Sequence, residues 1–136
     1  MIEEQADVLE AKYAPDNSVL LRIDEIEPLM KVTDLDFYNH VILSLEKYGL
    51  RYPLVIVEIG EDEWREEAET SGYINYPKPN ELPVRKRIQC GCTRYHAIKN
   101  HWPSIKWVEC VVFDNTKEAT ELCADLRRDK AWKNIK

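Results

Sequence analysis

Apolar residues recur at helical spacing in three stretches of the chain. After Asp34 they stand three and four residues apart up to Gly49, at Leu35, Tyr38, Val41, Ile42, Leu45 and Tyr48. This spacing gives a helix one apolar face, and Asp and Gly are favoured at the start and just past the end of a helix. The same spacing predicts a short helix over residues 2–13 and another after Asn115, where Glu118 stands at capping distance.

Other stretches have no helical period and are rich in β-branched and aliphatic residues: 19–23, 52–59, 84–90 and 107–113. Such runs predict strands, and the unbroken apolar run within 52–59 predicts a strand that is buried on both faces. Between the last two strands, Thr93 can cap a short helix that ends before Pro103. This order, without an internal repeat, predicts an α+β fold in which a small mixed sheet is flanked by helices.

The length of 136 residues suits one domain and is short for two. We therefore expect a single domain over residues 1–136, with its core in 19–128. Residues 60–83 interrupt that core as a long inserted loop, with a short helix predicted around 61–69. Loops of this length are usually lids, partner surfaces or mobile segments. A solvated insertion without a role is the equal alternative.

Charge is distributed unevenly along the chain. The net charge is −6, yet residues 84–136 carry 12 basic and 6 acidic side chains. An acidic domain is a poor general binder of nucleic-acid backbone, although a local phosphate pocket stays open. The basic triplet Arg85-Lys86-Arg87 is predicted first as a solvated strand edge and second as part of a phosphate or nucleic-acid patch.

The lengths of the apolar runs and the first residues of the chain indicate the compartment of the protein, and the compartment indicates the state of its cysteines. No apolar run approaches the roughly 20 residues of a membrane span, and the chain starts with acidic residues where a secretory signal would be basic. We therefore expect a cytoplasmic protein without membrane contact. Its four cysteines are then expected to be reduced thiols.

The segment with most chemical promise joins a predicted strand to a predicted helix through a glycine. It reads Ile88-Gln89-Cys90-Gly91-Cys92-Thr93-Arg94-Tyr95-His96-Ala97. The first N–H groups of a helix have no partner within the helix, and together with the helix dipole they favour an anion such as phosphate. Arg94 in the first turn can add a bidentate contact. Residues 91–95 are therefore a candidate phosphate cradle.

The order of three segments resembles the ParB/sulfiredoxin superfamily. These segments are Ile23-Asp24-Glu25-Ile26-Glu27-Pro28, Ser44-Leu45-Glu46-Lys47-Tyr48-Gly49-Leu50 leading into Pro53-Leu54-Val55-Ile56-Val57, and Gly91-Cys92-Thr93-Arg94-Tyr95-His96-Ala97. The last contains the Gly-x-x-Arg-x-x-Ala motif of the superfamily. Members bind nucleotide phosphates there, CTP in partition proteins and ATP in sulfiredoxins. The resemblance thus implies a nucleoside triphosphate, ATP or CTP, with Mg²⁺.

The resemblance carries over residue by residue. Gly91 and Arg94 match the phosphate-binding motif, and Cys92 stands where sulfiredoxins place their catalytic cysteine. Thr93 replaces the histidine of sulfiredoxins, and Cys90 replaces a glycine. A partition role is set aside because partition proteins add a DNA-binding and a dimerisation domain, whereas stand-alone domains of this family are common in phages and mobile elements.

Cys92 and His96 have two interpretations. A thiol at a helix N-terminus beside Arg94 is a candidate nucleophile, with His96 one turn away as its base. Alternatively Cys92 is a small buried residue and His96 is exposed to solvent. A zinc site using Cys90, Cys92, His96 and Cys110 lacks a second ligand pair at an ordinary spacing, so no metal site is assigned within the protein, and Cys110 is expected in the core.

The leading functional hypothesis is therefore a nucleotide-binding domain, acting as a nucleoside triphosphatase or a phosphotransferase through the cradle at Gly91, Cys92, Thr93, Arg94 and Tyr95. On this hypothesis Arg94→Ala is expected to abolish nucleotide binding and to leave the fold intact. The alternatives are a nucleic-acid-interacting or nuclease-like protein that uses its basic C-terminal half, and a catalytically inactive interaction module whose partner binds at 60–83.

Overall fold

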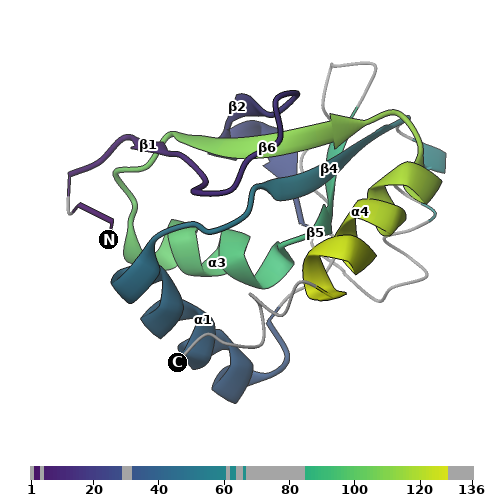
Figure 1. Ribbon diagram of the computed structural model, residues 1–136. Helices are drawn as coiled ribbons and strands as arrows, with labels where there is room; N and C mark the ends of the chain where they lie inside the picture. The colour runs from purple at the N-terminus through teal and green to yellow at the C-terminus, as the bar shows by residue number, and fades with distance from the viewer. Residues whose placement is uncertain are drawn as a thin grey trace.

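A mixed sheet of six strands organises the chain in the computed structural model, which describes residues 2–3, 5–28, 32–60, 62–63, 66 and 85–128. Figure 1 shows α1 and α3 on one side of the sheet and α4 on the other. In chain order the elements are β1 (Val8–Leu9), β2 (Val19–Arg22), a 3₁₀ turn (Ile23–Glu25), β3 (Ile26–Glu27), α1 (Leu35–Tyr48), β4 (Leu54–Ile59), β5 (Arg85–Cys90), α3 (Cys92–His101), β6 (Trp107–Phe113) and α4 (Thr116–Arg128).

The sheet is built around β4. The strand order is β1-β6-β4-β5-β3, and β2 pairs with β6 as well. Strand β4 runs parallel to β6 and antiparallel to β5. The side chains from Leu54 to Val57 have no exposed surface, because this central strand is covered on both faces. The unbroken apolar run predicted this burial correctly.

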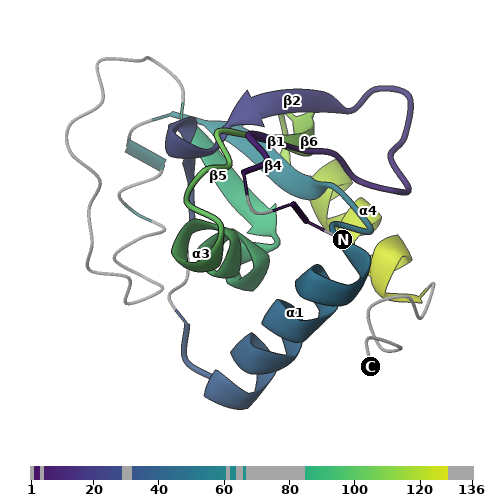
Figure 2. The ribbon, with the colours of Figure 1, turned by 90° about the vertical axis from the view of Figure 1, so that its left-hand side faces the viewer.

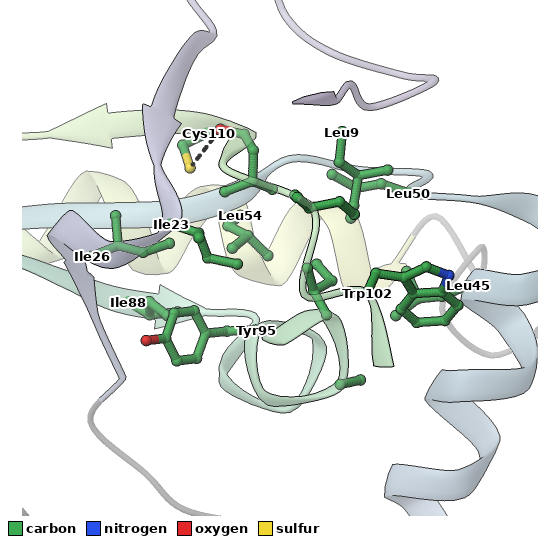
Figure 3. Packing of buried hydrophobic residues seen from close by; sticks show 14 of the residues in the cluster. Leu9, Ile23, Ile26, Leu45, Leu50, Leu54, Ile88, Tyr95, Trp102 and Cys110 are labelled. Carbon is green, nitrogen blue, oxygen red and sulfur yellow. Dashed lines mark hydrogen bonds between the residues drawn. The ribbon is translucent and has the colours of Figure 1, made fainter. Parts of the chain in front are cut away.

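Helix α1 follows its predicted boundaries. The Asp34 carboxylate accepts a hydrogen bond from the Phe37 amide at 3.0 Å, and Gly49 ends the helix with φ of 71°. Helices α1 and α3 lie side by side in Figure 2. The apolar core beneath them contains Leu45, Leu54, Tyr95 and Trp102, as Figure 3 shows.

The helix predicted over residues 2–13 is wrong. Strand β1 pairs in parallel with β6, and Ala11 forms a bridge with Leu50. The Glu109 carboxylate accepts a hydrogen bond from the Ala11 amide at 2.7 Å. Short helices are marginal by themselves, and here the sheet supplies the backbone hydrogen bonds that a helix would otherwise make within the segment. Leu9 is thereby buried.

The basic triplet is not a solvated strand edge, which corrects the first prediction for it. Strand β5 lies between β4 and β3, and Arg85 and Arg87 are only 1% and 3% exposed. The Arg85 guanidinium donates to the Glu27 carboxylate, and Arg87 donates to the side chains of Gln89 and Thr116. Because these two arginines are interior, they supply no surface patch for nucleic acid.

Other predictions fall partly outside the described residues. Of the inserted loop, Gly60, Asp62, Glu63 and Glu66 are described, and the rest of 60–83 lies outside the described residues.

Strand β6 has its predicted boundaries, and the Asn115 side chain caps α4 by accepting a hydrogen bond from the Glu118 amide at 2.9 Å. None of the helices in the described residues has the length and apolar character that a membrane span needs.

Candidate functional site

The junction between β5 and α3 turns on Gly91. This residue has φ of 116°, a backbone conformation that side chains disfavour. A Cβ atom there would lie 2.6 Å from Leu54 Cδ2 and 3.0 Å from Arg94 Nη2. Glycine is therefore required twice, for the backbone angle and for the close approach of β4 and Arg94.

Helix α3 starts two residues before the position expected from Thr93 as its cap. It begins at Cys92, and the Tyr95 amide donates to the Gly91 carbonyl at 2.8 Å to close the first turn. The glycine N-cap explains the shift, since the turn is set by backbone geometry instead of a side-chain oxygen. Thr93 stands within the first turn and is partly exposed.

The three described helices differ in how they begin. Asp34 caps α1 and Asn115 caps α4, each with a side-chain oxygen on a backbone amide. At α3 the N-cap is Gly91, which has no side chain to cap the amides. The partial positive charge of a helix N-terminus is therefore left at α3 without the acceptor that the other two helices carry.

Arg94 points into the protein from the first turn of α3. Its side chain is 7% exposed, and Nη1 donates to the Tyr52 carbonyl at 2.6 Å while Nη2 lies 3.4 Å from the Pro53 carbonyl. Burial lowers the pKa of the guanidinium, and the neighbouring thiols, Cys90 first, raise it in part. Arginine keeps its charge under such conditions, so a cation lies directly beneath the turn.

Cys92 and His96 lie one helical turn apart on α3, and both are partly exposed. The Cys92 Sγ atom is 3.9 Å from the Ile88 carbonyl. The His96 ring packs edge-on against Tyr95 with centroids 5.3 Å apart. Both side chains therefore keep access to solvent at the same end of the helix as the glycine turn.

Tyr95 is, like Arg94, a predicted cradle residue that the structure places in the interior. Its ring packs beside Ile88, as seen in Figure 3, and is 6% exposed. Burial raises the pKa of Tyr95 to about 12, with Glu27 and Asp24 adding to the effect. Lys99 Nζ lies 5.4 Å from the ring centroid. Tyr95 thus fixes the helix against the sheet from inside.

The cysteines are all free thiols. Among the described residues, no group of three or more His, Cys, Asp or Glu side chains could hold a metal ion. Cys110 is fully buried, and burial raises the pKa of its thiol to about 12. The sequence placed Cys110 in the core, and this is confirmed.

Sequence reasoning missed the backbone partners of Arg94. The Tyr52 and Pro53 carbonyls stand 42 and 41 residues before it, and carbonyl groups leave no trace in the side-chain pattern. The only indirect signal was Pro53, which marks a turn before a buried strand. The motif arginine therefore could be found by its spacing, but its inward direction could not.

No family model matches the chain, and no curated protein matches it. Solved structures do. The chromosome-partitioning protein ParB from Caulobacter crescentus, truncated at its C-terminus and complexed with CTP-gamma-S, aligns at 13% identity with a TM-score of 0.50. The match covers 84% of this chain and 54% of that one, so the chain spans about half of the ParB chain.

Sulfiredoxin from Arabidopsis thaliana aligns at 18% identity with a TM-score of 0.46, over 79% of this chain and 96% of that one. The likeness to ParB gives the fold: this chain is a small α+β domain with a ParB/sulfiredoxin-like arrangement of a mixed sheet and flanking helices. Both the predicted fold class and the predicted resemblance are confirmed. A shared fold leaves function to be argued from the site.

Proposed function

We propose that the first turn of α3 binds the phosphates of a nucleoside triphosphate, with Mg²⁺ as the counterion. The observation that carries this proposal is the N-cap of α3, which is a glycine in the left-handed conformation and has no side chain of its own to cap the first amides. Amides at a helix N-terminus and a positive dipole end suit a phosphate group. The ParB structure of similar fold is complexed with CTP-gamma-S, which supports a nucleotide as the ligand.

Each residue of the turn has a distinct part in this proposal. The Cys92, Thr93 and Arg94 amides donate to phosphate oxygens, and the Thr93 hydroxyl, partly exposed in the same turn, adds a donor. Arg94 acts from beneath. Its Nη2 atom lies 3.0 Å from where a Gly91 Cβ would stand, so its charge attracts the phosphate through a thin layer of protein in which electrostatic forces are weakly screened.

Catalysis at this turn takes the form of phosphoryl transfer or nucleotide hydrolysis. Such reactions depend mainly on positioning and on stabilising charge on the phosphoryl oxygens, which the amides and Arg94 supply. Mg²⁺ supplies further charge neutralisation and is held largely by the phosphates themselves. Cys92 is the nucleophile candidate and His96 its base, because both reach solvent beside the turn.

The test uses a charge change that spares the fold. A glutamate in the first turn of a helix is favourable to the helix dipole, yet it repels a phosphate. Thr93→Glu is therefore expected to keep or raise the free energy of unfolding while weakening nucleotide binding at least about 10-fold, or roughly 1.4 kcal/mol. Thr93→Gln is the matched control, similar in shape to glutamate and uncharged, and is expected to lose only the hydroxyl contact and to bind more tightly than Thr93→Glu.

Binding is measured by calorimetric titration with ATP, CTP, GTP and UTP in the presence of Mg²⁺, and released phosphate is followed in the same samples. Saturable binding of one nucleotide that Thr93→Glu loses assigns the turn and identifies the base. Binding that Thr93→Glu retains in full places the nucleotide elsewhere. Absence of binding by all four nucleotides overturns the proposal.

A further inference from the structure

A cluster of tyrosines and basic side chains lies where residues 11–13 run beside residues 50–52. Ala11 bridges Leu50, and the Lys12 and Tyr13 amides donate to the carbonyls of Leu50 and Arg51 at 2.9 and 2.8 Å. Two distant stretches of chain thus form one surface. We call it the tyrosine patch, and it consists of Lys12, Tyr13, Lys47, Tyr48, Arg51 and Tyr52.

Each basic side chain of the patch lies over a tyrosine ring. The Arg51 guanidinium carbon is 4.2 Å from the Tyr48 ring centroid, and Lys47 Nζ is 5.2 Å from the same centroid. Lys12 Nζ is 5.3 Å from the Tyr13 centroid. These distances are within the range of cation–π attraction. Arg51 and Lys47 are therefore held against Tyr48, and Lys12 against Tyr13.

The rings of the patch are graded in exposure. Tyr52 is 7% exposed, whereas Tyr13 is 52% exposed and packs against it with centroids 5.6 Å apart and an interplanar angle of 34°. Tyr48 is half-buried. A buried ring thus supports an exposed one, so that binding a planar ligand on Tyr13 orders few additional groups. Such preorganisation favours stacking.

We propose that the tyrosine patch binds single-stranded nucleic acid, with a base stacked on the exposed ring of Tyr13 and phosphates beside Lys12, Lys47 and Arg51. Proteins that bind single strands without sequence preference combine aromatic rings with cations along the backbone. A protein partner fits less well, because the central part of a protein interface is depleted in lysine and this patch contains two.

The surrounding charges set the character of the binding. Glu10, Asp16 and Glu46 are exposed and flank the patch in sequence, and the whole chain carries a net charge of −6. Electrostatic attraction alone is therefore weak here, and stacking must supply most of the affinity. Three phosphate contacts give a slope of log K against log salt of no more than about −2 for a single strand.

This surface is distinct from the basic C-terminal half of the chain, and its assignment does not depend on the nucleotide site. The two sites are nevertheless neighbours, since the Tyr52 carbonyl accepts the hydrogen bond from Arg94. The experiment therefore uses a probe that carries no triphosphate, a fluorescent oligothymidylate without terminal phosphates, in buffer without nucleotide, and the Tyr13 variants distinguish binding at the patch from binding at the α3 turn.

Fluorescence anisotropy at low salt is expected to show saturable binding of this probe to the wild type. Tyr13→Ala is expected to weaken binding about 5-fold or more, the effect of losing one stacked base, whereas Tyr13→Phe keeps the ring and the affinity. Phe37→Ala is the matched control, because Phe37 is 50% exposed on α1 and outside the patch. Circular dichroism checks that each variant is folded.

Lys47→Gln is expected to weaken binding and to reduce the salt slope by about 0.7. The proposal is overturned if the wild type does not bind the probe, or if Tyr13→Ala binds it as well as Tyr13→Phe does. It is overturned equally if polyglutamate displaces the probe as efficiently as unlabelled oligothymidylate, because simple charge attraction would then explain the binding.

Discussion

Arg94 Nη1 and the carbonyl oxygen of Tyr52 lie 2.6 Å apart, joining the first turn of α3 to the entrance of β4. The residue that the motif identifies as a phosphate ligand is thus also part of the interior. Its 7% exposure means that, under the proposed function, its charge acts on a phosphate through the turn, while its donors hold the backbone of another segment. The proposed function therefore couples stability and nucleotide binding at this one side chain.

The first prediction concerns the loss of that side chain. Arg94→Ala leaves the Tyr52 and Pro53 carbonyls without these donors and creates a cavity beneath Gly91. We expect the free energy of unfolding to fall by about 3 kcal/mol, a typical sum for an unsatisfied buried group and a truncated side chain. Urea denaturation measures this, and it replaces the expectation from sequence that the fold stays intact.

Arg94→Lys separates charge from geometry in the same experiment. Lysine keeps the positive charge but lacks the fork that contacts both carbonyls, so an intermediate stability is expected. If Arg94→Ala unfolds at the same urea concentration as wild type, the inward position of the guanidinium is wrong. The direct phosphate contact would then become the better explanation of this residue.

Gly91→Ala is the second prediction. The new methyl group would lie 2.6 Å from Leu54 Cδ2, at a backbone φ of 116°. Strain of both kinds predicts a loss of at least about 2 kcal/mol in the free energy of unfolding. Gly60→Ala is the matched control, because no heavy atom lies within 4 Å of its added Cβ. Equal unfolding midpoints for the two variants would contradict the described junction.

Periodicity located most of the fold because the pattern and the environment agree there. The face of α1 with Val41 and Leu45 is buried as its spacing demands, and the run from Leu54 to Val57 is the centre of the sheet. The same reasoning gave a wrong helix over residues 2–13. Their helical spacing is real, but the open edge of β6 offered hydrogen bonds that a local pattern cannot reveal.

The sequence predicted where the candidate site lies in the chain, but it did not predict in which direction the site's side chains point. The strand-glycine-helix order located the turn at Gly91, and motif spacing identified Arg94. Whether an arginine points outward or inward depends on carbonyls supplied by another segment, here those of Tyr52 and Pro53. The burial of Arg85 could not be predicted for a similar reason. Its carboxylate partner Glu27 belongs to a strand of only two residues, which is too short to show a pattern in the sequence.

The third prediction tests the ion pair between Arg85 and Glu27. Arg85 is 1% exposed and Glu27 12% exposed at their side chains. Removing one partner of a buried pair leaves a charge in the interior, so Glu27→Gln is expected to cost about 3 kcal/mol or more of unfolding free energy. The double variant Glu27→Leu with Arg85→Met is expected to recover part of the loss, since no charge is then buried.

An exposed ion pair provides the comparison for the third prediction. Arg22 Nε lies 3.2 Å from Asp24 Oδ1, and both side chains are largely in solvent. Asp24→Asn is expected to leave the urea midpoint almost unchanged, because water and salt screen such pairs. If Glu27→Gln were as mild as Asp24→Asn, the Arg85 guanidinium would have to be solvated, against its burial on β5.

The fourth prediction is a loss of stability at alkaline pH that depends on Tyr95. Burial raises the pKa of its hydroxyl to about 12 in the folded protein, against about 10 in the unfolded chain. The unfolded state therefore loses its proton first. The stabilisation is fully present below pH of about 10 and disappears as the pH rises through about 12, with a slope of at most about 1.4 kcal/mol per pH unit.

Tyr95→Phe isolates this contribution, because phenylalanine keeps the ring among Ile88 and its neighbours and has no proton to lose. Urea unfolding followed between pH 9 and 12 is expected to show a shallower decline for Tyr95→Phe than for wild type above pH of about 10. Cys110 titrates in the same direction in both proteins, since its pKa is also raised to about 12, so its effect cancels in the difference. Parallel declines would mean that the hydroxyl at Tyr95 is open to water in the folded state, and the helix would then be less firmly seated on the sheet than its burial indicates.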